Sequence, residues 1–324
     1  MMRRLQTPLL AALAVLGTAT MSAAQNRDFR VERNRTETKT ISLGASGVLD
    51  LDNFGGDIAV TAGSGRDVVV QIVRVSRGRT EADAQAGLDR VIVDVEQRGN
   101  RATIKMRYPE QDRQSPFRVR ASYNVTAPAA TAVNIKSLGG SIRVKGIHGD
   151  LSANTAGGNI EIGGAGRVSQ AKTLGGNVTL IGIDSDGVVA AETFGGNVTL
   201  QEIKARRLTG SSTGGEVTAR DITAENVELS SLGGSVEFSG ALVRSGRYDL
   251  HTTGGNVRFI PSGPVGFELD ASTFGGQIQT DLQLQTVGAT SGRGPARTLR
   301  GTFGDASAVV KATTMSGNVV IGKK

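Results

Sequence analysis

The sequence contains no cysteine and no tryptophan, and only 4% of its 324 residues are aromatic. Without cysteine, the chain has no disulfides, thiolate metal sites, cysteine nucleophiles or lipid-modified N-terminal cysteine. Beyond the first 24 residues, no apolar run approaches the roughly 18 residues that a membrane-spanning helix needs. We therefore expect a mature chain without a transmembrane segment, stabilised by packing and backbone hydrogen bonds.

The first 24 residues have the three parts of a secretory signal peptide. These are a basic start, an apolar stretch too short to span a bilayer and a small-residue cleavage site: Arg3 and Arg4, residues 9–17 and residues 22–24. We expect cleavage before Gln25 and export of the rest, with an uncleaved anchor as the alternative. Removing the two arginines from 37 basic residues leaves 35 against 30 acidic ones. This mild excess is compatible with contact to anionic lipid or polysaccharide, and a solvated surface is the simpler interpretation.

Glycine is abundant, at 45 residues, and it is arranged in a repeat. Successive Gly-Gly pairs after residue 138 are 18 to 21 residues apart, and a degenerate Ser-Gly pair follows the last one after 41 residues, or two periods. Such spacing defines a structural repeat of about 19 residues. The pairs begin at Gly55, Gly139, Gly157, Gly175, Gly195, Gly214, Gly233, Gly254 and Gly275, and the degenerate pair is Ser316-Gly317.

The residues around each pair repeat as well. A Ser or Thr stands two positions before it, a polar residue, often Asn, directly after it, and then a β-branched residue, as in Thr193, Asn197 and Val198. A second apolar residue usually follows at the next alternate position, which is the pattern of a half-buried strand. We expect the glycines to allow positive φ and close backbone approach. We expect the Ser/Thr and Asn positions to form ladders in which side chains on successive coils hydrogen-bond to each other and to corner backbone groups.

Residues 57–138 interrupt this period but still show strands. Residues 68–75, 91–97, 102–107 and 117–125 have strand patterns, and a short helix is expected from Thr80 to Leu88. We interpret this segment as an antiparallel excursion beside or over the first coil. Residues 288–304 are expected to form a polar loop that leaves the repeat between its last two coils.

The repeated T-x-G-G-N-[VI]-x-[LV] coils behind a signal peptide resemble the DUF4097 family of adhesin-like exported bacterial proteins, over roughly residues 48–322. The resemblance implies a right-handed β-helix and no catalytic residue set. The expected fold is thus all-β, a right-handed parallel β-helix of three-sided, about 19-residue coils. Its expected divisions are the signal peptide (1–24), a β-rich region with the first coil and a cap (25–135) and the repeats (136–324).

No residue pattern points to catalysis, a cofactor or a nucleic acid. Enzymatic β-helices need clustered carboxylates on one face, whereas the outward positions here are mixed and isolated. The sequence Asp184-Ser185-Asp186-Gly187 resembles a calcium loop but lacks its further ligands, so a turn is the alternative. His148 and His251 lie about five coils apart, too far to share a metal or a triad. Nucleotide loops and basic runs with interleaved aromatics are missing too.

The function expected is therefore that of an exported, non-enzymatic envelope protein, periplasmic or at the cell surface. It would present a solenoid face to an envelope polysaccharide or a protein partner. A carbohydrate-active lyase or hydrolase is the alternative. Arg293, Arg297 and Arg300 in the late loop either touch an anionic partner or are simply solvated. The ligand, the oligomeric state, calcium binding at Asp184 and Asp186 and a regulatory role in envelope stress stay open.

Overall fold

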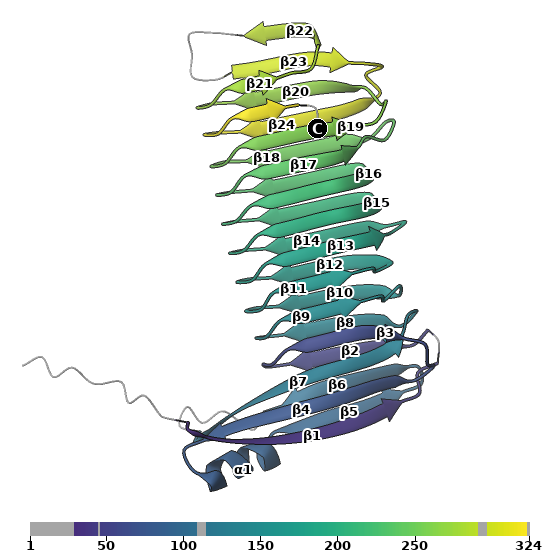
Figure 1. Ribbon diagram of the computed structural model, residues 1–324, viewed down its shortest axis with the longest axis vertical. Coiled ribbons are helices and arrows are strands. Elements are labelled where there is room, and N and C mark those ends of the chain that lie inside the picture. Colours follow the sequence, from purple (N-terminus) through teal and green to yellow (C-terminus); the bar gives the residue numbers. More distant parts are fainter. Residues whose placement is uncertain (1–28, 45, 109–114, 291–296, 323–324) are drawn as a thin grey trace, which may run out of the picture.

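A computed structural model describes residues 29–44, 46–108, 115–290 and 297–322. These residues form 25 strands, all in one sheet, and one helix, which confirms the all-β prediction. The strands are stacked along the long axis of the molecule (Figure 1). No helix in these ranges is both long and apolar enough to cross a membrane. The predicted signal peptide lies outside the described residues.

Most strands belong to two parallel columns, one before and one after the Gly-Gly pairs. In stacking order, the upstream column contains β6 (Arg101–Arg107), β2 (Val48–Asn53), β8 (Ala132–Ser137), β10 (Asp150–Thr155), β12 (Arg167–Thr173), β14 (Val188–Thr193), the ends of β15 (Val198–Ser212) and β16 (Val217–Ser231), β18 (Arg247–Thr252), β24 (Ala308–Thr314) and β20 (Phe267–Thr273). The downstream column contains β7 (Phe117–Pro128), β3 (Ile58–Gly63), β9 (Ile142–Lys145), β11 (Ile160–Gly163), β13 (Val178–Asp184), the starts of β15 and β16, β17 (Val236–Ala241), β19 (Val257–Ser262), β25 (Val319–Ile321) and β21 (Ile278–Thr280).

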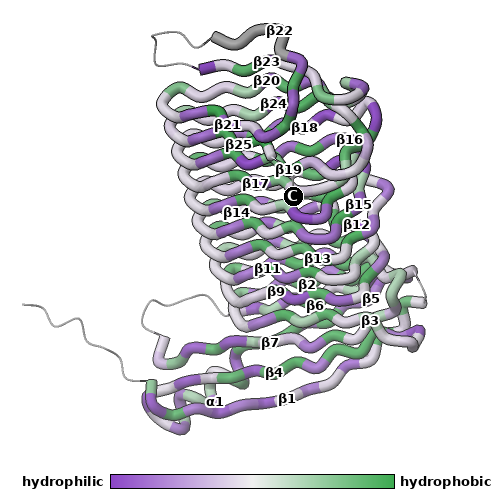
Figure 2. The backbone as a smooth tube through the Cα atoms, turned by 45° about the horizontal axis from the view of Figure 1, so that its top comes forward, coloured by the Kyte–Doolittle hydropathy of each residue, from purple (hydrophilic) through white to green (hydrophobic). Residues whose placement is uncertain are grey.

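The register places equivalent residues of successive coils directly above one another. Val198 of β15 pairs with Val217 of β16, and Leu200 pairs with Ala219. These four side chains are fully buried, as the alternating pattern predicts. Apolar residues recur in this way along the stacked strands (Figure 2). The core is therefore a set of vertical rows of Val, Ile, Leu and Ala, and each coil covers the apolar side of its neighbour.

A ladder of buried hydroxyl groups holds the Gly-Gly corners together. The Thr193 hydroxyl donates to the carbonyl oxygen of Gly176 in the preceding coil (2.7 Å) and accepts from the N–H of Gly196 in its own coil (3.2 Å). Thr173, Ser212, Ser231, Thr252, Thr314 and Thr273 repeat this arrangement. A second ladder runs beside it, in which the Asn177 side-chain oxygen accepts from the N–H of Asn197 (2.8 Å). Both predicted ladders are thus present, but within the described residues their hydrogen bonds join side chains to backbone groups and not to the side chains of the next coil.

The second glycine of each pair is required by the stacking. A Cβ on Gly215 would overlap the carbonyl oxygen of Gly196 one coil away, and the other second glycines of the repeat face the same obstacle. Positive φ, the other role expected for these glycines, occurs in this row only at Gly56 and Gly140. That expectation was wrong for the remaining coils, because close backbone approach alone selects glycine there. The first glycine is less constrained, since a Cβ on Gly214 would lie 3.4 Å from its nearest neighbour, the carbonyl oxygen of Gly195.

We predict that Gly215→Ala destabilises the protein while Gly214→Ala does not. The first change forces two coils apart at a corner, which should cost about 3 kcal/mol, as overpacking of a rigid site does. The second leaves ordinary contacts and should stay within about 1 kcal/mol of the parent. Urea unfolding of the two variants measures the difference. Equal loss in both variants would contradict the proposed role of the second glycine.

The N-terminal end is closed by an antiparallel layer. β1 (Val31–Ile41) pairs with β4 (Val68–Gly78), β4 pairs with β7, and β5 (Ile92–Arg98) pairs with β6, each time antiparallel. β6 and β7 are themselves parallel to β2 and β3 and lie beneath them. The coil of β2 and β3 therefore lies between the coil of β6 and β7 and the coil of β8 and β9, although both of these follow it in sequence.

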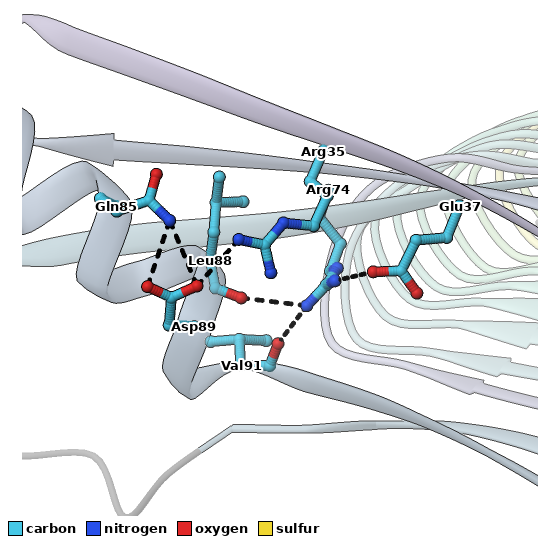
Figure 3. Close-up of polar contacts among 7 residues, drawn as sticks. All are labelled: Arg35, Glu37, Arg74, Gln85, Leu88, Asp89 and Val91. Atoms are coloured by element: carbon cyan, nitrogen blue, oxygen red, sulfur yellow. Dashed lines mark hydrogen bonds and ion pairs between the residues drawn. The ribbon is translucent and has the colours of Figure 1, made fainter.

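The predicted helix is present as α1 (Glu81–Arg90) and packs on this layer. Thr80 is its N-cap, and its hydroxyl accepts from the N–H of Asp83 (3.1 Å). Buried Arg74 of β4 closes the other end of the helix by donating to the carbonyl oxygens of Leu88 (3.1 Å) and Val91 (2.7 Å) (Figure 3). The same guanidinium pairs with Glu37 of β1. On the exposed side of α1, a hydrogen bond from Arg35 lowers the pKa of Asp89.

At the C-terminal end, too, the order in which the coils stack differs from their order in sequence. β24 and β25, the last strands in sequence, lie between the coil of β18 and β19 and the coil of β20 and β21. Residues 288–304, expected to be a polar loop, instead contribute to β22 (Gln285–Thr290) and β23 (Arg297–Phe303). These two strands pair antiparallel, and β23 covers the open edge of β20. The loop prediction was wrong because this segment supplies the edge strands that close the stack, and residues 291–296 within it lie outside the described residues.

Disulfide trapping in the cysteine-free chain tests this threading. Thr253 and Met315 occupy equivalent positions of adjacent coils, about 4.8 Å apart, whereas Thr253 and Phe274 are two coils apart, about 10 Å. We predict that Thr253→Cys with Met315→Cys oxidises to an intramolecular disulfide and that Thr253→Cys with Phe274→Cys does not. Gel mobility with and without reductant measures both. The reverse result would show that the coils stack in sequence order.

Candidate functional site

A row of exposed apolar side chains runs along the Gly-Gly edge of the stack. It consists of the residue between the Ser/Thr (Asn in the first coil) and the first glycine or its equivalent in each coil, and we call it the corner row. Seven of its members are large hydrophobic residues with exposed fractions between 41% and 65%, and they make up more than half of the twelve such residues in the described chain. In stacking order the corner row is Phe54, Leu138, Ala156, Leu174, Phe194, Thr213, Leu232, Thr253, Met315 and Phe274.

Backbone hydrogen bonds tie most of the corner row to neighbouring coils: Ala156, Thr213, Leu232 and Thr253 bond on both sides, and four further members bond on one side. The N–H of Leu232 donates to Ser212 in the coil before (3.2 Å), and its carbonyl oxygen accepts from Gly254 in the coil after (2.9 Å). The residue on one side of each row member carries the buried hydroxyl, and the glycines follow on the other side. Each exposed side chain therefore projects from a rigid corner, in line with those above and below it.

The corner row is an extended exposed apolar surface that is broken at Thr213 and Thr253. Each half-exposed large side chain offers on the order of 100 Å², so the seven together offer about 700 Å², of which about 400 Å² lies in the unbroken run from Phe54 to Phe194. The largest apolar patch on a typical monomer measures roughly 300–600 Å². Ten positions at about 4.8 Å per coil give the row a length of roughly 43 Å. The residues after the glycines, such as Asn177, Asn197 and Asn256, form a largely neutral, polar margin along one side.

At its N-terminal end the corner row meets a cleft. β4 and β7 continue past the Gly-Gly edge there and form a projecting layer (Figure 1). We call its outward face the arginine shelf: Val75, Arg77, Arg118, Arg120 and Ser122. These residues line the cleft together with Phe29, Glu32, Phe54, Asp57 and the glycines of the first two pairs. The Phe54 ring stands edge-on to Tyr108, with ring centroids 6.5 Å apart.

In the calcium candidate, residues 184–187, the Asp186 carboxylate is paired with an arginine. Arg167 donates two hydrogen bonds to the Asp186 carboxylate (3.1 Å each), and this contact raises the pKa of Arg167. A group of three or more His, Asp or Glu side chains able to hold a metal is not found in the described residues. The Ser185 hydroxyl accepts from the N–H of Gly187 (3.2 Å), so the local geometry is that of a hydrogen-bonded turn.

The other residues singled out in the sequence do not converge either. His148 and His251 are both exposed and lie on coils five steps apart. Of the three arginines in the late segment, Arg300 pairs with Asp270 (3.2 Å), Arg297 begins β23, and Arg293 lies outside the described residues. The outward carboxylates on the downstream column pair with arginines of adjacent coils, Glu161 with Arg143 (3.0 Å) and Glu237 with Arg220 (3.2 Å).

The corner row was readable in the sequence but was missed. Every T-x-G-G or S-x-G-G repeat carries one residue at x, and that residue is Phe, Leu or Met in most coils. The prediction used the Ser/Thr positions, the glycines and the residues after them, and assigned no role to position x. The arginine shelf had no such signal, because it depends on the pairing of β4 with β7, two segments separated by a helix and two strands.

Comparisons with known proteins give fold neighbours only. No family model and no curated protein matches the chain. Its structure is similar to that of a "putative adhesin" from Bacteroides fragilis (14% identity, TM-score 0.43) and a "putative lipid binding protein" from Parabacteroides distasonis (13% identity, TM-score 0.47). Each match covers 90% of this chain and 97% of the other. The DUF4097 resemblance therefore stays a prediction.

Proposed function

We propose that this chain is an exported, non-enzymatic interaction protein of the bacterial envelope, and that its corner row is the surface that binds a partner. The carrying observation is a line of ten corner positions, seven of them occupied by large exposed apolar side chains, along one edge of the stack. Exposing such a surface costs solubility and gives no fold stability, so it is expected where a partner covers it. Export rests on the signal-peptide pattern of residues 1–24.

A protein partner suits the corner row better than a polysaccharide does. Sugar rings stack on aromatic faces, but Phe54, Phe194 and Phe274 are separated from one another by four or five coils, or about 20 Å. The large side chains between them are Leu and Met, which pack against apolar protein groups without specific geometry, and the remaining positions are one Ala and two Thr. An apolar centre with a neutral polar margin is also the composition of a protein–protein interface.

We further propose that the repeats, residues 136–324 by the sequence division, form a right-handed and three-sided solenoid. Support comes from β15 and β16, which pair in three separate stretches per coil: residues 198–201 with 217–220, 203–205 with 222–224 and 207–212 with 226–231. Glu202 and Asp221 sit at one break with φ of 53° and 54°, as at a corner. Right-handed crossovers are general for parallel strands of one sheet.

The binding role is tested with three corner-row substitutions, Leu174→Asn, Phe194→Asn and Leu232→Asn, in the chain from residue 25 to 324. Truncating buried interface anchors commonly costs more than 1 kcal/mol each, so we expect retention on envelope fractions and on purified envelope proteins to fall at least about tenfold. Ultracentrifugal co-sedimentation with those fractions measures it.

The matched control carries Ile181→Asn and Val188→Asn, which remove exposed apolar side chains outside the corner row. This variant should be retained like the parent chain. Equal retention of the corner-row variant, or retention of neither protein, would contradict the proposal, and preferential retention on envelope polysaccharide would redirect it to the glycan partner.

A further inference from the structure

The cleft at the base of the corner row has a chemistry of its own. Only the second half of β7, from Tyr123 onward, pairs with β3 of the first coil. The first half passes beneath the Gly-Gly corner, where the N–H of Ala121 donates to the carbonyl oxygen of Gly55 (2.9 Å), and then projects beyond it. The outward face of this projecting half of β7 and the Gly-Gly corner therefore form the two walls of an angle. The corner glycines have no side chains that would fill this angle.

The shelf side of this angle is cationic. Arg77 of β4 lies directly opposite Arg118 of β7, and Arg120 follows two residues along the same face. Such like charges on adjacent strand positions repel each other in the absence of an anion. Glu32 neutralises Arg77 (2.7 Å), while the Arg118 guanidinium lies 5.0 Å from the centroid of the Phe29 ring. Among the described residues, Arg118 and Arg120 have no carboxylate partner.

Asp57, the second carboxylate that lines the cleft, is already hydrogen-bonded within the corner. The Asp57 side-chain oxygen accepts from the N–H of Ser141 in the next coil (2.8 Å), as the first step of the polar ladder after the glycines. It therefore belongs to the corner and is not positioned to pair with the shelf arginines. Two guanidinium groups remain available to an outside anion, each with several N–H donors suited to a carboxylate or phosphate.

The corner side of the same angle is apolar. Phe54, which is 41% exposed, and Phe29 both line the cleft, and Leu138 is the next residue of the corner row above Phe54. A second surface groove, on the upstream column near β18, also contains arginines, but Glu228 and Asp249 alternate with them and no aromatic ring is exposed there. The N-terminal cleft is distinct in offering unmatched cations beside an apolar wall.

We propose that this cleft binds an anionic amphiphile, whose carboxylate or phosphate group contacts Arg118 and Arg120 and whose alkyl chain packs on Phe54 and along the lower corner row. The two arginines determine where the charged head group binds. The apolar wall determines the direction in which the alkyl chain runs. This site goes beyond the proposed partner surface. The two tests substitute different residues, so they fail independently.

Isothermal titration with decyl phosphate and with decanoate, both below their micellar concentrations, tests the proposal and distinguishes the two head groups. Decyl maltoside supplies the same chain without the charge, and inorganic phosphate supplies the charge without the chain. We expect at least one of the two anionic amphiphiles to bind, and the neutral detergent and free phosphate to bind at least about tenfold more weakly, because each lacks one of the two recognised parts.

The double variant Arg118→Gln with Arg120→Gln should weaken that binding at least about tenfold, since it removes the charge-assisted hydrogen bonds to the head group. Arg66→Gln with Arg258→Gln removes the same charge elsewhere and should bind like the parent. Phe54→Ala should weaken binding of the amphiphile. Because Phe54 is exposed, the substitution should change the thermal unfolding temperature of the protein by no more than a few degrees. Equal affinity for decyl maltoside, an unaffected Arg118/Arg120 variant, or no binding by either anion would overturn the proposal.

Discussion

The close approach of backbones at the Gly-Gly corner is the constraint on which the rest of the structure depends. Consecutive second glycines, such as Gly196 and Gly215, lie so near each other that a single methyl group would not fit between them. That closeness brings the Ser/Thr hydroxyls within hydrogen-bond distance of two coils at once. The hydroxyl ladder, the buried Val and Ile rows and the straight line of the corner row all follow from one spacing.

The corner also explains why the exposed side chains form a surface of fixed shape. A residue on an ordinary loop would move with that loop, whereas eight of the ten corner-row residues have one or both backbone groups hydrogen-bonded to a neighbouring coil. A ligand or partner that binds along this edge meets side chains already in place, so less conformational entropy is lost on binding. Rigid presentation of this kind suits a binding scaffold, and the arginine shelf at one end gives the edge a direction.

Much of the fold could be predicted from the sequence because each repeat states its own local structure. The alternation after each glycine pair predicted the strands, and the Ala-rich segment with an acidic first turn from Thr80 predicted α1. The threading of both terminal coils could not be predicted in this way. The last coil, Thr314 to Ile321, has the same residue types as the coils between which it lies, so any coil fits on any other. Its place is decided by which strands cover the ends, and those strands, β22 and β23, carry no repeat pattern.

A distance along the corner row tests the regular stacking of the coils directly, because the length of the row depends on every stacking step between its ends. Spin labels on Leu138→Cys and Met315→Cys in the cysteine-free chain are separated by seven coils, which at about 4.8 Å each predicts a narrow distance distribution near 34 Å. Double electron–electron resonance should give that distance in the parent background. A broad distribution, or a distance that departs from it by more than the reach of the labels, would contradict a rigid stack of glycine-cornered coils.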